Sequence, residues 1–160
     1  MKGVADIAEV FGIFHDGSIA APLSDGLSEI VVEIEYLAER LSPSGSSFTI
    51  RFDDLERAAF SPWEESGQPA LPVIMGLASI LPLELEILSA KVVGDVVEVA
   101  CSCLSLDFPG GCLEIIASGC RVYDASGREW TLEELKKLAD DYWDEWSSRG
   151  GKPGEGEASG

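Results

Sequence analysis

Residues 83–106 read LELEILSAKVVGDVVEVACSCLSL, and this stretch decides the fold. Two runs rich in β-branched residues, 83–93 and 96–106, flank the dipeptide Gly94-Asp95. Such a dipeptide between two runs of this kind is typical of a β-hairpin. Alternate residues of the second run share one face of a strand by the two-residue period, namely Val97, Val99, Cys101 and Cys103. The stretch therefore predicts two antiparallel strands.

Four more segments outside the hairpin have strand character. They are the first half of 29–41, then 48–52, 113–123 with Gly119 as a bulge, and 128–130. In 29–41 a helical stripe competes with the strand pattern, and the β-branched run from Ile30 to Ile34 favours the strand.

Three connections between these segments are also predicted. Residues 124–127 open with aspartate and close with glycine, which suits a type I turn. Gly110-Gly111 indicates another turn. Residues 60–82 hold four prolines and form a long connection with a short helix near residues 74–79.

The end of the chain predicts an amphipathic helix. Thr131 and Glu134 stand at the positions of a capping box, and Trp130 and Leu135 at those of a hydrophobic staple. Apolar residues then recur at spacings of three and four. These residues are Leu132, Leu135, Leu138, Ala139, Tyr142, Trp143 and Trp146.

These elements together predict an α+β fold. The expected architecture is a mainly antiparallel sheet or sandwich of about seven strands, with the C-terminal helix packed on it. Residues 1–146 are expected to form one domain, and the glycine-rich residues 147–160 a flexible tail.

Composition excludes several classes of protein. The 160 residues carry 29 acidic and 11 basic side chains, a formal net charge of −18. This excess argues against a nucleic-acid binder, which needs a basic surface. With 46% hydrophobic residues, the chain can bury enough surface to fold. No apolar run is long enough to span a membrane, and the N-terminal segment lacks the features of a signal peptide, so a cytoplasmic protein is expected.

The chain contains one histidine, His15, which is followed by Asp16 and Gly17. One histidine excludes zinc sites of the His₃ and His₂Glu kinds, and we predict no metal, no cofactor and no set of catalytic residues. For His15 and Asp16, the favoured interpretation is a structural turn, in which Asp16 caps local amides and Gly17 takes a positive φ. The alternative is a ligand-binding pair at the mouth of a pocket.

The four cysteines also admit two interpretations. Cys101, Cys103, Cys112 and Cys120 lack the paired spacing of a structural zinc site. Their place in predicted strands favours buried, reduced thiols that act as small hydrophobic side chains.

An acidic cluster lies in the terminal helix, where Asp140, Asp141, Asp144 and Glu145 fall within six positions. Its ordinary interpretation is a solvated helix face, and its functional interpretation is a partner-binding site that includes Trp146. Trp143 belongs to the apolar stripe and is expected mainly in the core. The same stripe is also a candidate homodimer interface.

A family resemblance covers residues 11–60. The tetrapeptide Phe14-His15-Asp16-Gly17, the β-rich run 30–36 and the strand 48–52 resemble small bacterial domains of unknown function that open with a Phe-His-Asp signature. Some of these domains are similar to immunity proteins of polymorphic toxin systems. The resemblance implies a toxin-neutralising role and assigns no catalytic residue. The proline-rich connection and the terminal helix are not parts of that pattern.

Two functional hypotheses follow from these observations. The first is a non-enzymatic binding protein whose negative surface attracts a basic protein partner. The second is a small-molecule-binding or enzymatic β-sheet domain with His15 and Asp16 at its pocket. A deep pocket containing His15 would support the second hypothesis.

Overall fold

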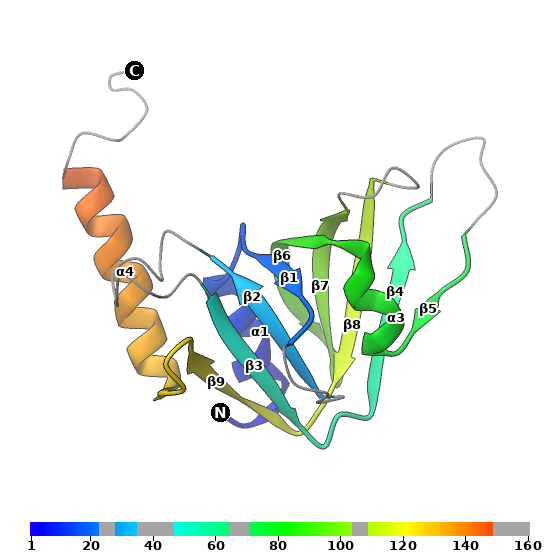
Figure 1. The fold of residues 1–160 in the computed structure, drawn as a ribbon, viewed down its shortest axis with the longest axis horizontal. Helices are drawn as coiled ribbons and strands as arrows, with labels where there is room; N and C mark the ends of the chain where they lie inside the picture. The colour runs from blue at the N-terminus through cyan, green and yellow to red at the C-terminus, as the bar shows by residue number, and fades with distance from the viewer. Residues whose placement is uncertain (23–27, 35–46, 65–70, 104–108, 149–160) are drawn as a thin grey trace.

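The computed structural model describes residues 1–22, 28–34, 47–64, 71–103 and 109–148. Their strands form one antiparallel sheet in the order β10-β9-β3-β2-β1-β6-β7-β8-β4-β5 (Figure 1). The strands are β1 (Ser18–Ala20), β2 (Glu29–Glu33), β3 (Ser47–Asp53), β4 (Arg57–Pro62), β5 (Ile74–Met75), β6 (Leu85–Val93), β7 (Val96–Cys103), β8 (Gly110–Ile116), β9 (Gly119–Asp124) and β10 (Glu129–Trp130). The helices are α1 (Gly3–Ile13), α3 (Leu77–Ile80), the 3₁₀ helix η1 (Leu81–Leu83) and α4 (Leu132–Ser148).

The hairpin predicted from residues 83–106 is present as β6 and β7. Gly94 takes a φ of +64° in the turn between them. Inward and outward residues alternate along β7, and the predicted inward set is buried. A bulge between Ile87 and Ser89 interrupts the pairing with β7. Residues 104–106 of the predicted second strand lie outside the described residues.

The α+β class and the antiparallel sheet are confirmed, but the described residues hold ten strands where about seven were expected. The predicted strand 29–33 is present as β2, and the second half of that segment lies outside the described residues. Strands β1, β4 and β5 were not predicted. Strands β1 and β5 are short, and three consecutive residues of β4 are buried, which hides the two-residue period.

The prediction of one strand over residues 113–123 is wrong, because the chain changes neighbours within it. Strand β8 pairs with β7 and β4, whereas β9 pairs with β3 and β10. The predicted turn at Gly110-Gly111 is also wrong, since both glycines belong to β8. A Cβ on Gly111 would lie 2.4 Å from the carbonyl oxygen of Ser61, so close strand packing explains this glycine.

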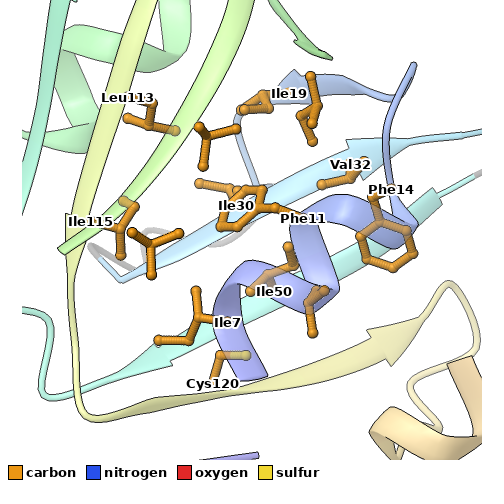
Figure 2. Packing of buried hydrophobic residues seen from close by; sticks show 14 of the residues in the cluster. Ile7, Phe11, Phe14, Ile19, Ile30, Val32, Ile50, Leu113, Ile115 and Cys120 are labelled. Atoms are coloured by element: carbon orange, nitrogen blue, oxygen red, sulfur yellow. The ribbon is translucent and has the colours of Figure 1, made fainter. Parts of the chain in front are cut away.

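Helix α1 was not predicted, and it occupies the centre of the fold. Its apolar residues Ile7, Val10 and Phe11, with Phe14 after the helix, are fully buried. Figure 2 shows Ile7 and Phe11 directed toward Ile30 of β2, Ile50 of β3 and residues of β8. The sheet therefore curls around α1, which packs against β6, β7 and β9.

The terminal helix α4 begins as predicted. The Thr131 Oγ1 accepts a hydrogen bond from the Glu134 amide at 3.1 Å, and the Thr131 amide donates to Glu134 Oε1 at 2.8 Å. Leu132, Leu135 and Leu138 are buried, so this stripe packs on the protein's own core. The helix continues through Ser148, and the rest of the predicted tail lies outside the described residues. No helix among the described residues is long and apolar enough to cross a membrane.

Candidate functional site: the α1–α4 surface

The turn after α1 holds His15 and Asp16, and it is tied to the sheet by backbone hydrogen bonds. The Asp16 amide donates to the Ile87 carbonyl at 2.7 Å, and the Ile87 amide donates to the Gly17 carbonyl at 2.9 Å. The structural turn is therefore present. These bonds hold the backbone immediately after His15 in a fixed place beside β6.

The predicted backbone roles of Asp16 and Gly17 are wrong. Asp16 takes the positive φ, at 70°, a conformation that aspartate tolerates better than most residues. Gly17 is needed for space. A Cβ there would lie 2.6 Å from Val32 Cγ1 and 2.9 Å from the Phe14 carbonyl oxygen. The Asp16 side chain is exposed, with its carboxylate 3.9 Å from His15 Nε2.

The structure brings His15 against α4, although 128 positions separate it from Trp143. The two rings are stacked, with centroids 5.9 Å apart and an interplanar angle of 11°. His15 Nδ1 lies 2.9 Å from the Gly12 carbonyl oxygen. Because a carbonyl only accepts, Nδ1 carries the proton in this arrangement. The ring is thus oriented from both sides, by the end of α1 and by α4.

An open groove of about 440 Å³ runs beside this stack, between α1, α4 and β6. Most of its lining side chains are small or apolar. They are Ala5, Ala8, Glu9, Gly12, Ile13, His15, Ala90, Ala139 and Trp143. His15 therefore lines an open groove, whereas the second hypothesis predicts a deep pocket, and Asp16 is not among the lining residues. The residues from α1 were missed in the sequence, although Ile7, Val10, Phe11 and Phe14 have the helical spacing that signals α1.

The predicted acidic cluster lies on the second half of α4. From Leu138 to Ser148 the helix contains four carboxylates and no basic residue, and the next cation, Arg149, lies outside the described residues. Asp140 and Asp144 are exposed, and neither forms an ion pair with any described residue. They stand one helical turn apart, where like charges repel.

The first half of α4 differs, because its basic residues are already paired. Lys136 Nζ lies 3.0 Å from Glu9 Oε2, which joins α4 to α1. Lys137 Nζ lies 3.1 Å from Asp141 Oδ2, so one of the four clustered carboxylates is partly neutralised. The unneutralised charge is thus concentrated at Asp140 and Asp144.

Aromatic side chains lie next to these carboxylates. Trp143 and Trp146 are 39% and 37% exposed, and their rings meet edge to face at 6.0 Å. Tyr142 contacts Trp143 in the same way at 4.9 Å and packs against the core. Trp143 was expected mainly in the core, but the last buried residue described on α4 is Leu138. In Figure 1 the second half of α4 extends away from the strands.

The cysteines lie elsewhere and all four are free. Cys101, Cys103 and Cys120 are buried, as the hydrophobic interpretation predicts. Burial raises the pKa of Cys101 and of Cys120 to about 12, so both remain protonated thiols at neutral pH. Among the described residues, no group of three or more histidine, cysteine, aspartate or glutamate side chains is arranged to hold a metal ion.

Comparison with known proteins assigns no function to these residues. No protein-family model, curated protein or solved structure matches the chain. We define the α1–α4 surface as His15, Asp140, Trp143, Asp144 and Trp146.

Proposed function

We propose that this chain is a non-enzymatic binding protein, and that its α1–α4 surface receives a cationic protein partner. One observation carries the proposal. The second half of α4 presents four carboxylates and no basic residue around two exposed tryptophans. Aromatic side chains next to charges are common anchors in protein interfaces. Exposed indole rings also bind arginine and lysine side chains by cation–π contact.

The charge of the whole chain supports the same function. A net charge of −18 attracts a basic partner over long range and raises the rate of encounter. At the surface itself, a cation placed between Asp140 and Asp144 relieves the repulsion between them. The His15–Trp143 stack fixes the indole before the partner arrives, so less side-chain entropy is lost on binding.

A defined cationic probe tests this proposal. We expect a fluorescein-labelled deca-arginine peptide to bind the protein, and its affinity to fall as NaCl is added, because salt screens the attraction. The double variant Asp140→Asn/Asp144→Asn should bind about three- to tenfold more weakly, as measured by fluorescence anisotropy. The single variant Trp143→Ala should also weaken peptide binding, although it removes no charge.

The matched control removes two carboxylates elsewhere. Glu56 and Asp95 are exposed and lie outside α4, so Glu56→Gln/Asp95→Asn removes the same amount of negative charge. Equal weakening in both double variants would mean that net charge alone drives binding, and the α1–α4 surface would then be rejected as the site.

The narrower form of the proposal is toxin neutralisation, in which the basic partner is a toxin protein. Its support is the resemblance of residues 11–60 to immunity-protein-like domains. The check is genetic: the neighbouring gene should encode a basic toxin domain, and coexpression of this chain should protect cells from it. Protection should decrease with Asp140→Asn/Asp144→Asn. A neighbouring toxin from which the chain gives no protection would contradict this form.

A further inference from the structure

A separate hollow of about 320 Å³ lies on the outer face of the sheet, over β6, β7 and β8. Along β7 and β8 its residues alternate with Val99, Cys101 and Leu113, which are buried in the core. The hollow therefore opens away from the core. We call it the β6–β8 hollow, and its lining residues are Trp63, Ser89, Lys91, Glu98, Ala100 and Cys112.

Trp63, the residue after β4, supplies an aromatic wall of this hollow. The register of β4 and β8, continued by one residue, sets Trp63 opposite Gly110, and the Trp63 amide donates to the Gly110 carbonyl at 2.9 Å. A Cβ on Gly110 would lie 2.7 Å from Trp63 Cζ3, so the glycine makes room for the indole ring over β8. Trp63 is 41% exposed. An exposed indole beside a hollow offers a stacking surface for a ligand with a flat face.

A loose ion pair forms another part of the lining. Lys91 of β6 stands opposite Glu98 of β7, and Lys91 Nζ lies 3.8 Å from Glu98 Oε1. This distance is too long for a hydrogen bond, so the ammonium group keeps donors and the carboxylate keeps acceptors for a ligand. The two opposite charges balance one another, so the pair selects neither an anion nor a cation.

The floor of the hollow is small and uncharged. Ser89, Ala100 and Cys112 stand side by side in the register of β6, β7 and β8. Burial raises the pKa of the Cys112 thiol, and the carboxylates of Glu98 and Glu114 add to this effect, so the thiol is neutral at neutral pH. The Ser89 hydroxyl forms no hydrogen bond with the residues that the structure describes. It adds a group that can both donate and accept.

We propose that the β6–β8 hollow binds a neutral saccharide, with a sugar ring stacked on Trp63. A pyranose ring has a face of C–H groups that packs on an indole, and hydroxyl groups around its edge. Neighbouring hydroxyls of one ring can accept a hydrogen bond from Lys91 and donate one to Glu98, because each hydroxyl does both. The volume of about 320 Å³ is at the small end for ligand pockets and suits a mono- or disaccharide unit.

The surrounding charges favour a neutral ligand over a charged one. The chain carries −18, and Glu64 follows Trp63 directly, so a nucleotide or another phosphate is repelled. A cationic ligand meets the ammonium group of Lys91. A neutral nucleobase also stacks on tryptophan, but its few polar atoms lie in one plane. The hydroxyl, ammonium and carboxylate groups of the hollow are better matched by a ligand with several hydroxyls.

An NMR titration of the full, ¹⁵N-labelled chain tests the proposal. Cellobiose, chitobiose, lactose, maltose and mannobiose are added in separate titrations, and ¹H–¹⁵N spectra follow the Trp63 indole N–H and the amides of Ser89, Glu98 and Cys112. We expect at least one disaccharide to shift these resonances together, with a Kd of about 0.1–10 mM, since one stacked ring and a few hydrogen bonds give a weak site. Adenosine is the competing probe for a nucleobase site.

Two variants and two matched controls test the residues. Trp63→Ala should weaken binding of the sugar about tenfold or more, because the stacking surface is lost. Glu98→Gln should weaken it about threefold or more, because a hydrogen bond to a neutral amide is weaker than one to a carboxylate. Val92→Ala and Glu56→Gln should bind like the wild type. Val92 is 42% exposed and points to the opposite face of β6 from Lys91, and Glu56 is exposed before β4. Circular dichroism checks that each variant is folded.

The proposal is overturned if no disaccharide shifts these resonances at about 50 mM, whether or not adenosine does. Equal binding by Trp63→Ala and Val92→Ala would overturn it too. The saccharide site and the α1–α4 surface fail separately, because α4 and β4 lie toward opposite ends of the molecule (Figure 1). Deca-arginine binding should not depend on Trp63, and sugar binding should not depend on Asp140 or Asp144.

Discussion

At the scale of single residues, the turn after α1 shows why two neighbouring positions, Asp16 and Gly17, tolerate different substitutions. Asp16 has the left-handed backbone conformation, while Gly17 has none of that strain and is confined by its neighbours. A sequence shows the pair Asp-Gly and suggests that glycine supplies the unusual φ. Only the packing of Val32 and Phe14 against Gly17 reveals that glycine is required for space.

Two glycine substitutions compare a crowded position with an open one. Gly17→Ala should destabilise the protein by about 1–3 kcal/mol, because the new Cβ meets Val32 Cγ1 and a backbone oxygen of Phe14. Gly12→Ala should stabilise it by about 0.5–1 kcal/mol, because Gly12 is helical and its Cβ would meet no atom within 4 Å. Urea denaturation measures both. A stable Gly17→Ala variant would show that β2 moves away from the turn at little cost.

At the scale of elements, the turn between β9 and β10 depends on Asp124. Its carboxylate accepts four hydrogen bonds: from the Ser126 amide and hydroxyl, from the Arg128 amide and from Trp130 Nε1. Burial alone would raise the pKa of Asp124, but the hydrogen bonds from Ser126, Trp130 and Arg128 together lower it below the ordinary value of 3.8. The charged form of Asp124 thus holds the turn that leads into α4.

This lowered pKa predicts a pH dependence of stability. The contribution of Asp124 is fully present above pH 3.8, the value of the unfolded chain, and is lost as pH falls through the lower pKa of the folded state. Asp124→Asn should therefore cost about 1–2 kcal/mol at pH 7, and the difference from the wild type should shrink toward pH 2. Denaturation at several pH values measures this difference. A constant difference down to pH 2 would contradict the role of the charge.

The elements also divide by how well the sequence predicted them. The β6–β7 hairpin and α4 were predicted because their signals are local: a Gly-Asp turn, a capping box and a regular apolar spacing. Residues 113–123 looked like one strand because nothing local marks the point where the chain leaves β4 and β8 for β3. Helix α1 has the helical spacing of Ile7, Val10, Phe11 and Phe14, but its sequence is apolar on most sides, so the contrast between a buried and an exposed face is weak.

The candidate site was only partly predictable for a related reason. Asp140, Asp144 and Trp146 are close in sequence, so their clustering was visible. The stack of His15 on Trp143 joins the two ends of the chain, and it depends on how the sheet places α1 and α4 together. No spacing in the sequence encodes that contact. One hypothesis therefore named His15 and the other named the acidic cluster of α4, and the structure places both on the α1–α4 surface.

At the scale of the whole molecule, the charge of −18 opposes folding as well as favouring a cationic partner. We expect the free energy of unfolding to rise by about 1 kcal/mol or more between 10 mM and 300 mM NaCl, because salt screens the repulsion within the folded chain. Urea midpoints at the two salt concentrations measure the change. Sucrose, which screens no charge, serves as a control for general solvent effects. A midpoint that falls with salt would show that attractive ion pairs dominate.

The junction of β1 and β6 has a consequence for communication between the ends of the molecule. The two five-strand halves meet there through the pair Ser18↔Glu86 and the hydrogen bonds of Ile87 to Asp16 and Gly17. Helix α1 packs against β6 and β7 of one half and against β9 and α4 of the other, so it helps to set the angle between the halves. A smaller side chain in place of the buried Phe11 would therefore loosen the position of the α1–α4 surface without being part of it.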